Sequence, residues 1–226
     1  MVKDFPWPAP VSGRIAFDID GVFGNVMALF IRLAREWYQI DSLRYEDITR
    51  YYLYDCLDLA PEIIDEIIEK ILDYPHALEM VPFDQSVPVL SRYGQIHPLT
   101  FVTARTKAEP ITDWVCRCLS AVEPGRIRVI ATGEHTRKLE VLQDLGFRYY
   151  VDDHLETCHL LYRNDIMPIV YEQPWNQEPH PYPRVGGWEE LGNLLFEGGI
   201  HENIDRRRRG PGTCPGLENC PESPGN

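Results

Sequence analysis

The sequence indicates an α/β protein, built as a doubly wound parallel sheet with a small helical cap inserted after the first strand. Short apolar segments alternate along the chain with segments whose apolar residues recur at helical spacing. One long stretch after the first apolar segment breaks this alternation and shows only helical spacing. Strands that alternate with helices favour a parallel sheet covered on both faces.

The first predicted strand is RIAFDID, at residues 14–20, and a helix is predicted to follow over residues 25–39. Residues 41–74 are again predicted to be helical, because isoleucines form an apolar stripe and Pro61 suits the first turn of a helix. Since no strand is predicted between these helices, we assign residues 25–81 to the cap.

The alternation of strands and helices resumes after the cap. Further strands are predicted at HPLTFVTAR, RIRVIAT, FRYYVDD and MPIVYEQ, and helices over residues 85–93, 110–120, 136–145, 155–163 and 188–196. The core therefore comprises residues 14–24 and 82–198. The remaining residues, 199–226, are rich in Arg, Gly and Pro and are predicted to form a disordered tail.

Composition and charge limit the kinds of partner. Apolar residues make up 44% and charged residues 25%, as in soluble globular proteins. No apolar run approaches the roughly 20 residues of a membrane helix, and the N-terminal segment lacks the apolar core of a signal peptide. We expect a cytoplasmic protein with no membrane partner. A net charge of −13 argues against binding duplex nucleic acid, but a small anion can bind beside a cation.

The six cysteines and one run of arginines are also candidates for disulfides or binding sites. Four cysteines lie in globular sequence and are expected to be free thiols in a reducing compartment: Cys56, Cys116, Cys118 and Cys158. Cys214 and Cys220 lie in the tail, where two free thiols are better supported than a small disulfide or half of a metal site. The four arginines at residues 206–209 are expected to be a solvated charge run rather than a binding patch.

Polar residues gather where the predicted strands end, and ligands of a doubly wound sheet bind at the carboxyl ends of its strands. These residues are Asp18 and Asp20 after the first strand, Thr103, Ala104 and Arg105 after the second, Lys138 beyond the third, and Asp152 and Asp153 after the fourth.

The four acids among them point to a cation. Two carboxylates ~4 Å apart repel by roughly 4 kcal/mol at an effective dielectric near 20, so such a group needs protons or a metal ion. A set of oxygen ligands favours magnesium, and the candidate ligands are Asp18, Asp20, Asp152 and Asp153. DIDG alone fits a turn or a helix cap equally well. The second pair of acids, in VDD, favours the metal site.

Asp18 and Asp20 also suit phosphate chemistry. Hydrolysis of a phosphate monoester is very slow in water, and an aspartyl-phosphate divides it into two easier steps. One carboxylate must then attack while another group transfers protons. Asp18 and Asp20 lie two residues apart, and the turn at Gly21 can place Asp20 over the leaving group. A metal ion would offset the repulsion between the nucleophile and the phosphate.

Three positions offer contacts to a phosphate oxygen. Thr103 supplies a hydroxyl and Ala104 a backbone N–H, although a threonine after a strand is often only a cap. Lys138 opens a helix, where the helix dipole disfavours a cation unless an anion lies in front of it; otherwise it is a surface lysine. Arg105 is either a second phosphate contact or a surface or capping arginine.

Four segments resemble, in order, the sequence motifs of the haloacid dehalogenase-like (HAD) phosphatase superfamily. They are FDIDGVF, FVTAR, the lysine of HTRKLEVLQDLG, and VDDHLE, and the resemblance spans residues 15–156. It implies a HAD-like Rossmannoid core with Asp18 as nucleophile and Asp20 as general acid/base. It also implies that Thr103 binds the transferred phosphoryl group and that Lys138 stabilises it.

The same resemblance implies the metal ligands and the branch of the superfamily. Asp152 and Asp153 would bind magnesium together with Asp18 and the backbone carbonyl of Asp20, with either adjacent acid as the direct ligand. The helical insert and YPRVGGWEEL resemble the nucleotidase-like branch, which includes deoxyribonucleotidases and bacterial nucleotidase-like proteins. Val-Phe follows Gly21 where many members have Thr-Leu, but the Thr is often absent in this branch.

These features predict a magnesium-dependent phosphatase for a small monoester, with a (deoxy)nucleoside 5'-monophosphate as the expected substrate. A polynucleotide 3'-end phosphatase is an alternative, disfavoured by the acidic charge and the cap. A non-catalytic HAD-fold binding protein should lack Asp18 or Asp20, and both are present. Aromatic residues of the cap could stack on a base, but packing within the cap or between the cap and the core is the favoured interpretation. A homodimer and the oligomeric state in general are left open.

Overall fold

A computed structural model of the protein describes residues 14–197 and contains one parallel sheet of six strands. The strands are β1 (Ile15–Phe17), β2 (Leu99–Thr103), β3 (Ile127–Ala131), β4 (Tyr149–Asp152), β5 (Met167–Tyr171) and β6 (Arg184–Val185). Their order in the sheet is β3-β2-β1-β4-β5-β6, and all neighbouring strands are parallel. The predicted doubly wound fold is therefore confirmed.

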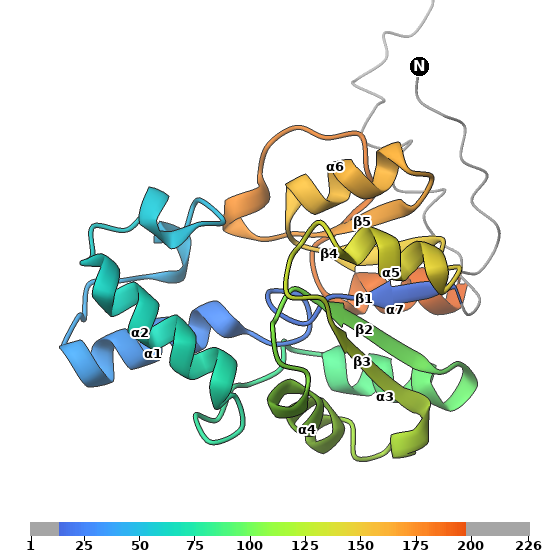
Figure 1. The fold of residues 1–226 in the computed structure, drawn as a ribbon, viewed down its shortest axis with the longest axis horizontal. Coiled ribbons are helices and arrows are strands. Elements are labelled where there is room, and N and C mark those ends of the chain that lie inside the picture. Colours follow the sequence, from blue (N-terminus) through green and yellow to red (C-terminus); the bar gives the residue numbers. More distant parts are fainter. Residues whose placement is uncertain (1–13, 198–226) are drawn as a thin grey trace, which may run out of the picture.

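Helices cover both faces of this sheet (Figure 1). They are α3 (Ser86–Ile96), α4 (Glu109–Cys118), α5 (Lys138–Asp144), α6 (Leu155–Arg163) and α7 (Trp188–Glu197). Alternate residues of β1 reach opposite faces, as expected for a strand. Phe17 packs with Tyr93 of α3 and Trp188 of α7, whereas Ala16 belongs to the smaller core under α5 and α6. Both faces of the sheet are buried, which explains the nearly continuous apolar runs in its strands.

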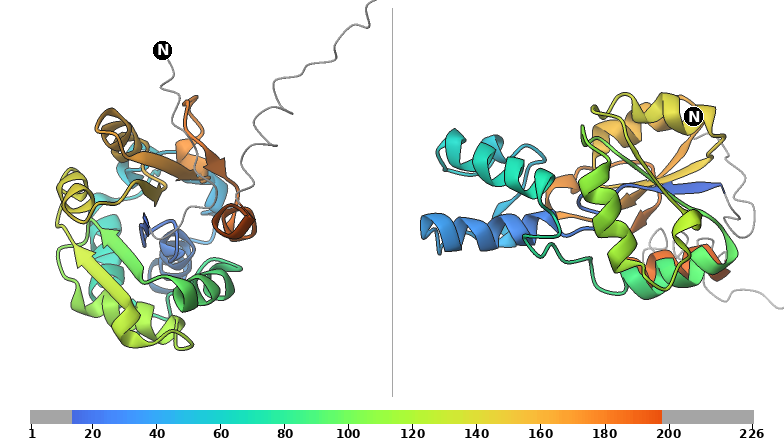
Figure 2. Two further views of the ribbon diagram at one scale, coloured as in Figure 1. Left: turned by 90° about the vertical axis from the view of Figure 1, so that its right-hand side faces the viewer. Right: turned by 60° about the horizontal axis from the view of Figure 1, so that its bottom comes forward.

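Residues 25–81, which we call the cap, project from the sheet as a separate helical layer (Figures 1 and 2). Helix α1 (Val26–Tyr38) is capped at its N-terminus by Asn25, whose side chain accepts a hydrogen bond of 3.1 Å from the backbone N–H of Ala28. Helix α2 (Pro61–Asp73) begins at its predicted proline and packs on α1 through buried isoleucines.

The helix predicted over residues 41–60 is wrong. That segment is irregular apart from two short 3-10 turns, η1 (Tyr45–Asp47) and η2 (Leu53–Asp55). The Asp47 side chain accepts a hydrogen bond of 2.8 Å from the backbone N–H of Arg44, which favours a turn over a helix. The hydroxyl of Tyr45 donates to Gln173 in the core, at 2.9 Å. Contacts with the core therefore decide the path of this loop.

The structure also contains a short strand that was not predicted, and it tests the predictions about cysteines and membrane helices. Strand β6 was missed because only two residues pair with β5, with Pro181 and Pro183 before them and two glycines after them. Cys56, Cys116, Cys118 and Cys158 are free thiols, as expected. Within residues 14–197, no helix is long and apolar enough to span a membrane. Cys214, Cys220 and the four arginines at 206–209 lie outside the described residues.

Candidate active site

Three of the predicted acids meet at the carboxyl end of the sheet. Asp18 directly follows β1, Asp152 ends β4 and Asp153 comes next. One oxygen from each of these carboxylates lies within 4.8 Å of the other two. All three side chains are buried. The parallel sheet explains the cluster, since β1 and β4 are neighbours in the centre of the sheet.

Lys138 is the cation that faces this cluster. It is the first residue of α5, and its side chain is fully buried. Its Nζ lies 3.0 Å from Asp18 Oδ2 and 3.1 Å from Asp152 Oδ2. Burial opposes the positive charge, but the two carboxylates outweigh it and raise the pKa of Lys138. The anions expected in front of this helix include these carboxylates, so the interpretation as a surface lysine is wrong.

Two oxygen atoms of the cluster have no partner among the described residues. Asp18 Oδ1 and Asp153 Oδ1 are buried and accept no hydrogen bond. Burial raises the pKa of Asp18 to about 7 although Lys138 opposes the shift, and it raises the pKa of Asp153 well above its usual value. Asp152 differs, since its Oδ1 accepts a hydrogen bond of 2.9 Å from the backbone N–H of His154 and its Oδ2 faces Lys138. The two unpaired oxygens suit a hard cation.

Asp153 is held by side chains that the sequence analysis did not identify. Trp175 Nε1 donates a hydrogen bond of 2.8 Å to Asp153 Oδ2, and the Asn176 side chain donates one of 2.8 Å to the Asp153 carbonyl. Both residues belong to η4 (Pro174–Asn176), just after β5. Their place after a strand was a usable signal, because the carboxyl end of β5 lies at the same edge of the sheet as the acids.

Gly21 brings the turn after β1 against Asp153. Its φ is +80°, a left-handed conformation that suits glycine. A Cβ atom at this position would lie 2.2 Å from Asp153 Oδ2. The Gly21 carbonyl also accepts a hydrogen bond of 2.6 Å from Gln173 Nε2. The turn therefore leaves no room for any other residue.

Replacing Gly21 by alanine is expected to displace the Asp153 carboxylate. The affinity of the acid cluster for a divalent cation should fall by at least about tenfold, in the range that loss of groups supporting metal ligands produces. A binding titration with magnesium measures the effect. Gly133→Ala is the matched control, because Gly133 also has a positive φ, of 77°, but nothing lies within 4 Å of its Cβ position. Equal affinities for magnesium in both variants would contradict the prediction.

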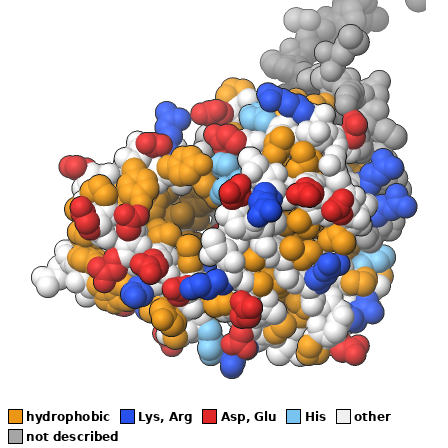
Figure 3. All heavy atoms as spheres, in the orientation of Figure 1, with side chains coloured by type: hydrophobic (Ala, Val, Ile, Leu, Met, Phe, Trp, Pro, Cys, Tyr) orange, Lys and Arg blue, Asp and Glu red, His pale blue; other side chains and the backbone are white. Residues whose placement is uncertain are grey.

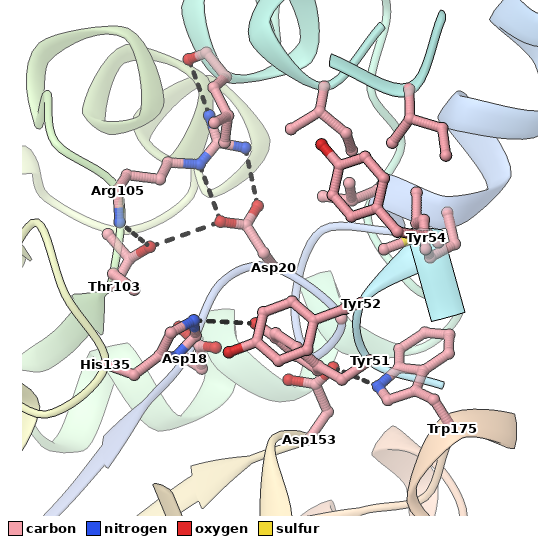
Figure 4. A pocket seen from close by; sticks show the side chains of 18 residues that line it. Asp18, Asp20, Tyr51, Tyr52, Tyr54, Thr103, Arg105, His135, Asp153 and Trp175 are labelled. Carbon is pink, nitrogen blue, oxygen red and sulfur yellow. Dashed lines mark hydrogen bonds and ion pairs between the residues drawn. The ribbon is translucent and has the colours of Figure 1, made fainter. Parts of the chain in front are cut away.

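Asp20 and Arg105 form a second charged group beside the acid cluster (Figure 4). Arg105 donates from Nε to Asp20 Oδ2 at 2.9 Å and from Nη2 to Asp20 Oδ1 at 2.7 Å. The Thr103 hydroxyl lies 3.4 Å from Asp20 Oδ2. Arg105 is only 5% exposed, so the alternative of a surface arginine is wrong. The carboxylate of Asp20 therefore points to Arg105 and Thr103. Its role as a metal ligand stays a prediction.

A cavity of about 290 Å³ lies between the cap and the core. Asp18, Asp20, Thr103, Ala104, Arg105 and Asp153 lie at its polar end. Its other walls are mainly apolar, with tyrosines of the cap loop and apolar residues of α2, namely Tyr51, Tyr52, Tyr54, Ile64, Ile68 and Leu72. Figure 3 shows the hollow framed by hydrophobic side chains. Tyr51 packs against His135 and His154 of the core, as expected for packing between the cap and the core, whereas Tyr52 and Tyr54 are about half exposed beside the cavity.

His135 also lines the cavity and was not predicted. Its Nε2 lies 3.2 Å from the Tyr51 hydroxyl, and its ring contacts that of His154, with centroids 4.3 Å apart. Burial and the nearby Lys138 lower the pKa of His135 to about 4. It is therefore neutral near pH 7. Its position beyond β3 was the only signal in the sequence.

Known proteins resemble this chain in sequence and in fold. The family model of 5' nucleotidase, deoxy (pyrimidine), cytosolic type C protein matches residues 12–198. OB0422 of Oceanobacillus iheyensis, described as an inferred nucleotidase, is 22% identical over 191 residues, which cover 79% of this chain and 96% of that protein.

Two solved structures share the fold. A haloacid dehalogenase-like hydrolase of Streptococcus pneumoniae has a TM-score of 0.53 and 16% identity, and the match covers 78% of this chain and 95% of that chain. A HAD-superfamily hydrolase of subfamily IA from Geobacter sulfurreducens has a TM-score of 0.51 and 15% identity, with coverages of 83% and 98%. At these identities the likeness establishes the fold of the chain.

Proposed function

Because the chain belongs to the family of 5' nucleotidase, deoxy (pyrimidine), cytosolic type C proteins, within the HAD-like hydrolases, we propose that it is a magnesium-dependent phosphatase for (deoxy)nucleoside 5'-monophosphates. Family membership makes it a phosphoric monoester hydrolase. The observation that carries the proposal is the meeting of three carboxylates with Lys138 at the end of a cavity, with two oxygens left unpaired.

The proposed reaction has two steps. In the first, an oxygen of Asp18 bonds to phosphorus while the bond from phosphorus to the ester oxygen breaks, and Asp20 gives a proton to that oxygen. In the second, water attacks the aspartyl-phosphate, Asp20 takes a proton from the water, and Asp18 and inorganic phosphate are released. Thr103, the backbone of Ala104 and Lys138 would hold the phosphoryl oxygens, and Arg105 lines the same cavity as Thr103 and Ala104.

The residues present fit a magnesium ion. Asp18 Oδ1 and Asp153 Oδ1 are buried and unpaired. Burial raises the pKa of both carboxyl groups, and a bound cation would stabilise their charged forms. Lys138 faces the other oxygen of Asp18, so it does not block this position. Asp153, rather than Asp152, would be the direct ligand, because both oxygens of Asp152 already have partners. When bound, magnesium offsets the negative charge of nucleophile and phosphate.

Removal of the metal is expected to abolish activity and lower stability. A chelator should stop turnover, and magnesium should restore it and raise Tm, since a ligand that binds only the folded state stabilises it. Activity assays and thermal melts with and without magnesium measure both effects. Asp153→Asn should lose the rise in Tm, whereas Asp113→Asn, on the surface of α4, should keep it. A chelated enzyme with full activity would contradict the proposal.

The walls of the cavity support a substrate with one phosphate and an uncharged aromatic group. Arg105 is the only Lys or Arg among the described residues that line it, and Asp20 already pairs with it. A second phosphate would therefore find no free partner. Tyr52 and Tyr54 are about half exposed beside the cavity, where a flat base can stack on them. The cavity lies between the cap and the core and suits a small molecule better than a polynucleotide end.

A panel of phosphate esters tests the proposed substrate. Nucleoside 5'-monophosphates should show higher kcat/KM than sugar phosphates, bisphosphates and DNA with a 3'-phosphate. Tyr52→Ala should weaken nucleotide use by roughly 1–3 kcal/mol, as loss of base stacking does. Tyr74→Ala is the control, because Tyr74 is similarly exposed on the cap but does not line the cavity. Equal use of sugar phosphates and nucleotides would contradict this substrate class.

A further inference from the structure

Arg105 contacts the cap as well as Asp20, and the contact lies where a helix ends. Helix α2 ends at Asp73, and the last carbonyls of a helix have no partner within it. Arg105 Nη1 donates to the Leu72 carbonyl at 2.9 Å and lies 3.5 Å from the Ile71 carbonyl. A guanidinium at this place also suits the negative end of the helix dipole.

The geometry of Arg105 fixes the carboxylate of Asp20. The guanidinium is planar and rigid, so carbonyls bound on one side determine where its other N–H groups point. Those groups bind both oxygens of Asp20, in the two-point arrangement that gives strong and directional pairing. The Arg105 side chain is 2% exposed and that of Asp20 is 25% exposed, so solvent competes weakly for the arginine.

This pairing bears on the proton transfers assigned to Asp20. A group that transfers a proton must be held at a fixed place beside the reacting atoms, and Arg105 holds both oxygens of Asp20. Under the proposed mechanism, on which this inference rests, Asp20 takes the proton of the water that attacks the aspartyl-phosphate. We infer that Arg105 is a positioning residue that holds Asp20 as the base for hydrolysis of the aspartyl-phosphate, and that α2 orients Arg105 for this task.

The inference predicts a defect in one step only. Without Arg105, the bond from Asp18 to phosphorus still forms, and a leaving group that needs no proton, such as 4-nitrophenolate, still departs. Attack by water slows because the base is no longer held. In Arg105→Gln, steady-state kcat with 4-nitrophenyl phosphate should fall on the order of 10²-fold, the lower range for general acid–base catalysis, while the phosphorylated enzyme accumulates.

Rapid mixing followed by acid quench tests this prediction. With excess 4-nitrophenyl phosphate, Arg105→Gln should release a burst of 4-nitrophenolate and retain phosphate on the protein. Lys107→Ala is the matched control, because Lys107 lies in the same loop and pairs with Asp73 of α2 at 2.8 Å but does not touch Asp20. It should behave like the unchanged enzyme. Arg105→Lys keeps the charge without the two-point pairing, so it should show a smaller burst than Arg105→Gln. It replaces the glutamine variant in this test if that variant does not fold.

Three outcomes overturn the inference. A loss of kcat without accumulated phosphoenzyme, in both Arg105 variants, indicates a structural role. A higher KM with unchanged kcat, together with weaker inhibition by inorganic phosphate, indicates a phosphate contact. A burst of the same size in Lys107→Ala indicates that loss of any contact between this loop and α2 causes the defect, whether or not Asp20 is involved. Absence of a phosphoenzyme in every variant, even under rapid quench, instead contradicts the proposed mechanism itself.

Discussion

Replacing Asp18 by asparagine is expected to abolish phosphatase activity while the fold stays intact. Asparagine keeps the size of the side chain but removes the carboxylate that we propose as the nucleophile. Loss of a nucleophile lowers kcat on the order of 10⁴- to 10⁶-fold in well-studied hydrolases. Hydrolysis of 4-nitrophenyl phosphate at saturating magnesium measures the loss. Retained activity above about 1% would contradict the role of Asp18 as nucleophile.

The fold should survive because the charge of Asp18 is unfavourable without a metal. Burial raises the pKa of this carboxyl to about 7. A neutral asparagine avoids that cost, and Lys138 keeps its pairing with Asp152 at 3.1 Å. The chelated variant is therefore expected to melt at the same temperature as the chelated parent protein or above it. Asp113→Asn, which alters an exposed acid paired with Arg117, should leave both activity and Tm unchanged.

Much of the fold followed from local patterns in the sequence. Helix α6 has the predicted bounds, and α2 begins at the predicted proline, because apolar spacing and a proline in the first turn specify helices locally. Residues 41–60 could not be predicted in this way. Tyr45 and Tyr51 of that segment contact Gln173 and His135 of the core, which lie far away in the chain. No local pattern encodes those contacts.

In the candidate site, too, some residues could be predicted from the sequence and others could not. Asp18, Thr103 and Asp152 could be predicted because parallel strands place their carboxyl ends together. The side-chain partners of Asp20 and Asp153 could not be predicted. Trp175 binds Asp153, and Arg105 binds Asp20, through side-chain directions that depend on the path of loops. Strand order brings residues to one edge, but the loops decide which atoms are paired and which stay free for a ligand.

Lys138→Met is expected to have the largest effect on stability. Methionine can fill much of the space but leaves the carboxylates of Asp18 and Asp152 without their buried cation. Removal of one partner from a buried pair costs roughly 3–5 kcal/mol. Urea unfolding in the presence of a chelator measures the change in the free energy of unfolding. Activity should also be lost, since the proposed mechanism requires Lys138 to stabilise the phosphoryl group.

Two further variants separate this effect from simple loss of a lysine. Lys107→Met breaks a surface pair with Asp73, in which the lysine is 62% exposed, and should cost less than about 1 kcal/mol. The double variant Lys138→Met/Asp152→Asn removes one of the two carboxylates left without a cation. It should be more stable than Lys138→Met alone, because its interior holds one fewer uncompensated charge. If the two substitutions were instead additive, the contribution of Lys138 would lie in packing rather than in charge.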